Sequence, residues 1–425
     1  MNRYYISKGL TGLCFVCLFL CQANLLWALS PGVDNPSPSK VKGIKAHLFQ
    51  HKIFYVSTYG NDDNNGTLAK PFKTLQRALY EVSPGDIILI RGGIYDINVE
   101  VNVSGKPDEP VIIKSYPGEK AVFDGSNYDP SVSVKFRITG SWLIVKDIEV
   151  RNGPSDGILL TQGASYNVLE NVVVHGNYFA GIELENGAHH NLIRNCDSFE
   201  NFDYGPSKGE HADGFGVKFS VGPGNRLIGC RAWSNSDDGF DLWDAGAPVV
   251  IEYCWAWENG YDIWGVGAAF QGDGNGFKLG PGSPTVHHCM AWNNARRGFD
   301  FNDATQVQYI YNNTSYKNAL HGFKFGLNHH VLRNNLSFLD GANKLDSKVD
   351  DKFNSWNTPP GVTVTIKDFV SLDDAKARGP RKKGGGLPNT EFLQLRHDSD
   401  LIDAGIDVGL PFYGSAPDLG ARESY

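Results

Sequence analysis

The sequence lacks the features expected of a membrane span, a disordered chain or a fibrous repeat. Its most apolar stretch, 10–20, is too short to cross a bilayer comfortably. Its composition has neither the bias of a disordered chain nor that of collagen, and 425 residues can bury a sizeable core. What the chain does have is 49 Gly among many short apolar runs. That pattern is typical of many turns between short strands.

Positive charge is also scarce. Arg3 and Lys8 precede the apolar stretch and Ala28 is a plausible cleavage point, so we predict a signal peptide at 1–28 and a linker at 29–52. Without that peptide, 37 of the 39 Lys and Arg remain against 47 Asp and Glu, a charge of about −10. We therefore expect a secreted or periplasmic protein with no transmembrane segment and no nucleic-acid partner. An acidic substrate would have to be held by local cations or by a metal.

A repeat of about 24 residues runs through the middle of the chain, with two intervals lengthened to 34 and 35. One column of the repeat is small or apolar: Ile148, Val172, Cys196, Cys230, Cys254, Cys289, Thr314 and Leu336. A second column has the same period and the same two long intervals: Gly157, Gly181, Gly214, Gly239, Gly276, Gly298 and Gly322. Each repeat holds strands of a few residues, so we predict an all-β parallel β-helix over 53–339. The long intervals predict loops at 202–211 and 261–274.

Both ends of such a stack need a cover, because open sheet edges invite aggregation. Apolar residues at helical spacing over 72–82, ended by Pro84 and Gly85, predict an N-terminal capping helix before a first strand at 86–91. The segment 340–425 is expected to pack on the last coils, with 379–386 as an exposed loop. The four cysteines outside the signal peptide share a column with Ile, Val and Leu. Packing therefore explains them, and we favour free buried thiols over the disulfides common in exported proteins.

The repeat register brings acids together. Asp213 and Asp238 each precede a column glycine, which puts them on adjacent coils ~4.8 Å apart. Asp237 and Asp241 flank Asp238, so four carboxylates would converge and repel one another. A Ca²⁺ ion, which takes six to eight oxygen ligands, would relieve this repulsion, whereas Zn²⁺ prefers His or Cys. Asp beside Gly often serves only to make turns, but four acids in stacked register favour the metal.

Lys278 occupies the column of Asp241, one coil further on. Beside a bound cation its pKa would fall, and a neutral amine there could act as a general base. The alternative is a surface lysine paired with Asp241 or Asp300. Further basic residues on or near this face are candidates for binding substrate carboxylates, or else solvated surface charges: Lys218, Arg296, Arg297 and Lys324. Three tryptophans could stack on sugar rings or belong to the core: Trp243, Trp257 and Trp264.

Three motifs resemble the family 9 polysaccharide lyases: HADGFGVK at 211–218, NSDDGFDLWD at 235–244 and GNGFKLG at 274–280. Members of that family are right-handed parallel β-helices that cleave pectate with Ca²⁺. The resemblance implies that Lys278 abstracts the proton. It implies a set of four Ca²⁺ ligands: Asp213, Asp237, Asp238 and Asp241. The stretches 54–79 and 402–423 also resemble secreted β-helix proteins and lyases of this kind.

The activity implied is that of a monomeric, secreted pectate lyase. It would cleave polygalacturonate or pectin by β-elimination to a 4,5-unsaturated product, with an alkaline pH optimum because the lysine must be neutral. Three alternatives remain. A polygalacturonase-like hydrolase could use Asp237 and Asp238 as its acid and base. The chain could also be a lyase of another uronate polymer, such as rhamnogalacturonan, or a non-catalytic carbohydrate-binding β-helix.

Overall fold

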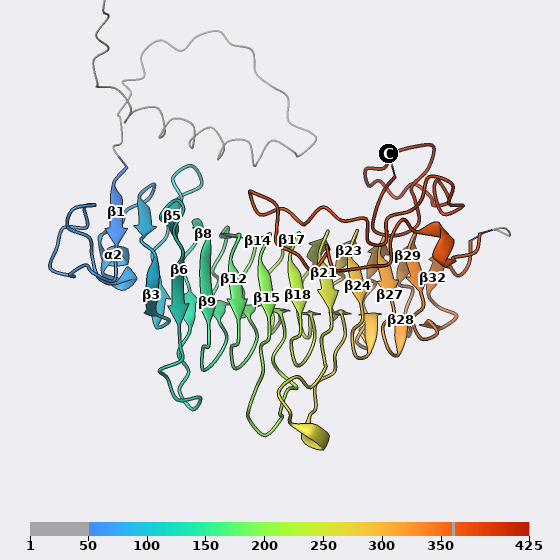
Figure 1. Ribbon diagram of the computed structural model, residues 1–425, viewed down its shortest axis with the longest axis horizontal. Helices are drawn as coiled ribbons and strands as arrows, with labels where there is room; N and C mark the ends of the chain where they lie inside the picture. The colour runs from blue at the N-terminus through green and yellow to red at the C-terminus, as the bar shows by residue number, and fades with distance from the viewer. Residues whose placement is uncertain (1–50, 359–361, 425) are drawn as a thin grey trace, which may run out of the picture. The chain divides into compact units, whose positions relative to one another are not determined.

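Short parallel strands in three sheets build the protein, as Figure 1 shows for this computed structural model. The structure describes residues 51–358 and 362–424. The predicted signal peptide and nearly all of the linker at 29–52 lie outside them. Within these residues, no helix has the length and apolarity that crossing a membrane requires.

Each complete coil contributes one strand to each sheet, the first sheet has one further strand at either end, and neighbouring strands are parallel. The first sheet contains β1 (Ile53–Val56), β2 (Ile87–Ile90), β5 (Val111–Ser115), β8 (Leu143–Lys146), β11 (Val168–Glu170), β14 (Leu192–Arg194), β17 (Asn225–Ile228), β20 (Val249–Glu252), β23 (Thr285–His287), β26 (Tyr309–Tyr311), β29 (Val331–Arg333) and β32 (Asp350–Lys352). The second contains β4 (Val99–Val101), β7 (Phe136–Ile138), β10 (Ile158–Leu160), β13 (Ile182–Leu184), β16 (Phe215–Val217), β19 (Phe240–Asp241), β22 (Phe277–Lys278), β25 (Arg297–Asp300), β28 (His321–Phe325) and β31 (Lys344–Leu345). The third contains β3 (Gly93–Asp96), β6 (Ala121–Asp124), β9 (Ile148–Arg151), β12 (Val173–His175), β15 (Asp197–Phe199), β18 (Arg231–Trp233), β21 (Trp255–Trp257), β24 (Met290–Trp292), β27 (Thr314–Tyr316) and β30 (Leu336–Phe338).

The expected columns form ladders inside the coils. The residues after the glycines stack ring on ring, with centroids 4.7–4.9 Å apart: Phe215, Phe240, Phe277, Phe299 and Phe323. The four cysteines are free and fully buried in their own column, as favoured above. These ladders fix the spacing of the outward-facing residues on the second sheet.

A ladder of buried asparagines holds the turns that lead from the third sheet to the second. The ladder begins at Asn177, and the Oδ1 of each later member accepts hydrogen bonds from the backbone N–H and the Nδ2 of the member one coil earlier: Asn201, Asn235, Asn259, Asn294 and Asn318. Sequence analysis did not identify this ladder. Five of its members stand five residues after the small or apolar column residue of their repeat, a spacing that could have revealed the ladder.

The N-terminal cap is the expected one. Helix α2 (Leu75–Glu81) begins at Thr74, whose side chain accepts a hydrogen bond from the backbone N–H of Arg77. It buries Leu75, Ala78 and Leu79 against the first coils and ends before Pro84. One difference is that β1 precedes the helix and pairs with β2, so the first strand comes before the predicted one at 86–91.

The C-terminal segment both extends the coils and packs on them. Strands β31 and β32 continue the coils beyond 339, and residues after them form a second apolar cluster against the third sheet, including Phe392 beside Trp292. The loop at 379–386, predicted to be exposed, is anchored at Arg381, whose guanidinium binds Asp197 on β15. Lys382 and Lys383 are exposed. Two short 3₁₀ turns, η1 (Gly267–Ala269) and η2 (Ile366–Asp368), complete the described elements.

The asparagine ladder should be essential for stability. We expect Asn259→Leu to lower the free energy of unfolding by about 3 kcal/mol or more, because it leaves the backbone N–H of Asn235 buried without its acceptor and removes one hydrogen bond each from the Nδ2 of Asn235 and the carbonyl of Ala232. Denaturant and thermal unfolding would measure this. The matched control is Asn127→Leu at an exposed position. An equal loss in both variants would contradict a special role for the ladder.

Candidate active site

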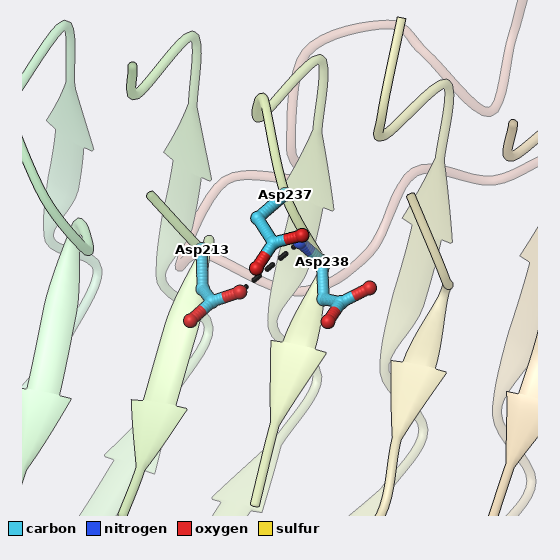
Figure 2. A group of neighbouring side chains, drawn as sticks. All are labelled: Asp213, Asp237 and Asp238. Carbon is cyan, nitrogen blue, oxygen red and sulfur yellow. Dashed lines mark hydrogen bonds between the residues drawn. The ribbon is translucent and has the colours of Figure 1, made fainter. Parts of the chain in front are cut away.

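Three buried carboxylates meet where the chain enters β16 and β19. Asp213 lies on one coil and Asp237 and Asp238 on the next, as Figure 2 shows. One oxygen from each can be chosen so that all three lie within 4.8 Å of one another. Asp213 and Asp238 are fully buried and Asp237 is 2% exposed. The register therefore places three of the predicted ligands together.

Hydrogen bonds fix the orientation of these acids. Asp213 Oδ1 accepts from the backbone N–H of Asp238 at 3.0 Å. Asp237 Oδ1 accepts from the backbone N–H of Asp273 at 2.6 Å. Asp238 Oδ1 accepts from the backbone N–H and the side-chain amide of Asn275, both at 2.7 Å. Each acid thus has one oxygen held in place by the neighbouring coil.

The fourth predicted ligand, Asp241, lies outside the group of three but next to it. It pairs in register with Gly216 on the preceding coil and with Lys278 on the following one. Its Oδ1 accepts from the backbone N–H of Trp243 at 2.9 Å. Its Oδ2 lies 3.6 Å from the Nζ atoms of both Lys218 and Lys278. Asp241 therefore connects the three acids to two amines.

Lys278 projects from β22 into this cluster. Its Nζ lies 3.1 Å from Asp238 Oδ2, 3.6 Å from Asp241 Oδ2 and 3.9 Å from Asp273 Oδ2. Its side chain is 16% exposed, so the amine is shielded yet reachable from the surface. The predicted neighbour relation between Lys278 and the acids is present in the structure.

The electrostatics of the cluster show how unfavourable the gathered charges are. Burial raises the pKa of Asp238 to about 6, with Lys278 opposing the rise and Asp213 adding to it. Burial and the charge of Asp238 raise the pKa of Asp237 well above its ordinary value. Burial lowers the pKa of Lys278, but the surrounding acids raise it by more. The lowering predicted for this lysine therefore depends on a cation that cancels the charge of the acids.

The donor set fits a hard divalent cation. All the converging groups are carboxylate oxygens, which Ca²⁺ prefers, and no cysteine takes part because that column faces the core. Asp238 Oδ2 is a buried oxygen that accepts no hydrogen bond, and the charge that faces it is the amine of Lys278 at 3.1 Å, which a neutral lysine would no longer supply. A buried, unsatisfied carboxylate oxygen is costly unless a charge compensates it.

The four predicted substrate-binding residues divide into two groups. Lys218 is 7% exposed, and its Nζ lies 2.6 Å from Asp213 Oδ2 and 3.9 Å from Glu183 Oε2. This burial favours a role in holding the acids over contact with a polymer. The other three lie on later coils and are already paired: Arg296 with Asp273, Arg297 with Asp300, and Lys324 with Asp300 and Asp303. Of these, Arg296 has the most exposed side chain, at 39%.

Sequence reasoning missed two acids of this region. Glu183 on β13 is buried and faces Lys218, and its place in the column of Asp241 was the signal available. Asp273 lies in the second long loop, beside Lys278 and Arg296. Because that loop departs from the repeat, no register could have placed Asp273.

Comparison with known families decides what kind of protein this is. A family model described as the Pel9A-like, right-handed β-helix region matches residues 54–343, more than half of the chain. The chain belongs to this family. The predicted right-handed parallel β-helix and the resemblance to family 9 polysaccharide lyases are both confirmed.

The relatives of this Pel9A-like chain carry consistent names. Pectate lyase L of Dickeya dadantii (strain 3937) is 38% identical over 432 residues, covering 96% of this chain and 98% of its own. Pectate lyase PEL9 of Emericella nidulans is 33% identical and covers 83% of this chain and 94% of its own. The crystal structure of pectate lyase Pel9A superposes with a TM-score of 0.81 at 39% identity, covering 88% of this chain and 96% of its own. A rhamnogalacturonan lyase superposes with a TM-score of 0.73 at 28% identity, covering 82% and 97%.

Glu183 should make the stability of this Pel9A-like chain depend on pH. Burial raises the pKa of Glu183 from 4.5 to about 8. The protonated carboxyl therefore favours folding below pH 4.5, and this contribution is lost as the pH rises to about 8. With a chelator present, Glu183→Gln should reduce that loss by on the order of 2 kcal/mol. Thermal unfolding from pH 4 to 9 measures it.

The control for this prediction is Glu391→Gln, which neutralises an exposed acid. It should leave the pH dependence unchanged. Parallel curves for the wild type and Glu183→Gln would contradict the assignment.

Proposed function

We propose that this polysaccharide lyase is a secreted or periplasmic pectate lyase, exported by the signal peptide at 1–28. It cleaves the α-1,4 bonds of polygalacturonate or pectin by Ca²⁺-dependent β-elimination, with Lys278 as the base. The observation that carries the proposal is the position of Lys278 Nζ, 3.1 Å from Asp238 in the acid group that suits a cation. The names of the relatives support the substrate class.

The proposed reaction starts with removal of a proton from C5 of a uronate, next to its carboxylate. A Ca²⁺ ion bound by Asp213, Asp237, Asp238 and Asp241 would hold that carboxylate and withdraw charge from it, which acidifies the proton. Lys278 Nζ takes the proton, and the bond between C4 and the glycosidic oxygen breaks. The products are a new chain end with a 4,5-unsaturated uronate and a released sugar, whose leaving oxygen takes up a proton and becomes a hydroxyl.

Other side chains of the cluster support this step. Lys218 neutralises Asp213 and Asp241 from the protein side and so keeps both carboxylates in place. Asp238 and Asp241 hold the amine of Lys278 in place, with their Oδ2 atoms 3.1 and 3.6 Å from its Nζ. Arg296, with its partly exposed side chain, is the best placed of the basic residues to meet a further carboxylate of the polymer.

A second candidate function is cleavage of a rhamnogalacturonan backbone, favoured by the structural likeness to a rhamnogalacturonan lyase. Its lower identity, 28% against 39%, places it second. A hydrolase that uses Asp237 and Asp238 is disfavoured, because both carboxylates are buried in one cluster and such an enzyme gives Lys278 no role. A non-catalytic binding module would have the same fold and would show no turnover of any of these polymers.

The base assignment predicts the effect of Lys278→Arg. Arginine keeps the positive charge but cannot lose its proton in a protein. We therefore expect kcat on polygalacturonate with Ca²⁺ to fall by about 10²–10⁴-fold, with melting little changed. The measurement is the ultraviolet absorbance of the unsaturated product at alkaline pH.

The matched control is Lys344→Arg, an exposed lysine of the same sheet on β31. It should retain full activity. Retained turnover in Lys278→Arg would remove this lysine as the base, and reducing ends without unsaturated product would indicate a hydrolase.

The metal assignment predicts that a chelator abolishes turnover at a temperature where the protein stays folded. Activity should return with Ca²⁺, and Asp238→Asn should need a higher Ca²⁺ concentration because one charged ligand is lost. Product absorbance and circular dichroism on the same sample measure the two effects. If the chelator lowers melting but leaves turnover unchanged, the ion has no part in the reaction.

A further inference from the structure

A hollow of about 310 Å³ lies beside the acid group, at the turns where three successive coils leave the second sheet. Eight residues line it, and six of them carry the argument: Trp243, Asp244, Pro281, Asn302, Asp303 and Gln306. Its volume lies at the lower end of the range usual for small-molecule sites. The acids and Lys278 do not line this hollow.

The register of the coils makes this hollow a slot. Because Asp241 pairs with Lys278 and Lys278 with Asp300, positions two residues further on also align, which puts Trp243, Gly280 and Asn302 in one column. A side chain at Gly280 would meet the backbone carbonyl of Leu242, so this glycine lets the two coils pack closely, and Pro281 after it lines the hollow. Trp243 and Asn302 therefore form opposite walls, two coil spacings or roughly 10 Å apart.

One wall of the slot is an aromatic ring open to solvent. Trp243 is 49% exposed, and its partner in ring contact is Phe219, 5.3 Å away in an edge-on arrangement and itself 38% exposed. By contrast, Trp257 is 2% exposed in a stacked ladder and Trp264 stacks on Phe202. Of the three tryptophans considered for sugar stacking, Trp243 alone offers a large free surface.

The other groups of the slot disfavour a negatively charged ligand. Asp244 and Asp303 stand on opposite walls, while Asn302 and Gln306 supply neutral donors and acceptors. Lys324 offsets only part of this charge, since its Nζ lies 3.4 Å from both Asp300 and Asp303. A ligand that carries a carboxylate would be repelled, whereas an uncharged sugar ring could stack on the indole and bond to the amides.

The slot is coupled to the reaction centre. Pro281, which lines the slot, follows Lys278 by three residues, so it lies roughly 10 Å from that lysine along the chain. The backbone N–H of Trp243 donates to Asp241 Oδ1. We propose that the slot binds an uncharged pyranose of the pectic polymer, attached to or near the uronate at Lys278, and so selects partly neutral substrate. This inference rests on the proposed function.

Trp243→Ala tests the proposal by kinetics. The Michaelis constant for partly methylesterified pectin should rise about fivefold to tenfold, as expected for a lost stacking contact, with kcat little changed. For fully de-esterified polygalacturonate it should change by less than about twofold. Tyr253→Ala, at an exposed aromatic remote from the slot, is the control and should affect neither. An equal rise on both substrates, or no rise on either, would overturn the proposal.

Binding without turnover separates this inference from the proposed function. A methyl-esterified trigalacturonate and a neutral galactobiose are titrated calorimetrically into the wild-type protein and into Trp243→Ala, both in the presence of a chelator. If the wild type binds one of these ligands and Trp243→Ala does not, the result supports the slot, and the ligand that binds identifies the source of the uncharged ring. Failure of both to bind the wild type would overturn it. If no polymer yields unsaturated product but binding depends on Trp243, the lyase proposal fails and the slot stands.

Discussion

Backbone hydrogen bonding between successive coils fixes which side chains become neighbours. Once Phe215, Phe240 and Phe277 are stacked at a spacing of 4.7–4.9 Å, residues at the same offset on the outer face have no freedom to separate. Asp241 must then lie beside Lys278, and Asp213 must lie one coil from Asp238. The parallel ladder therefore supplies the energy that holds like charges together against their repulsion.

The repulsion itself gives the site its chemistry. The acids are buried and held by hydrogen bonds to the next coil, so they cannot turn away to solvent. Two amines, Lys218 and Lys278, compensate part of their charge, one from inside and one toward the open face. A divalent cation would compensate the rest, and would at the same time release the amine of Lys278 from the acids that raise its pKa.

Sequence alone predicted the parts of the fold that repeat. The columns of glycine, phenylalanine and cysteine predicted the β-helix, the two long loops and the neighbour relation between Asp241 and Lys278. What it could not predict lies where periodicity stops. Asp273 comes from a loop without register, and the anchoring of Arg381 on Asp197 joins segments 184 residues apart. The burial of Lys218 was also missed, because a column gives the direction of a side chain but not its depth.

The asparagine ladder has a consequence for how the molecule can vary. Asn201 and Asn259 are each pinned to the coils above and below, and both long loops start just after a ladder asparagine and end just before a strand of the second sheet. With both ends anchored, extra residues in such a loop cost little conformational entropy. The rim around the acids is thus free to lengthen or shorten during evolution while the acids stay in place. New polymer preferences could arise there without any change to the reaction beneath.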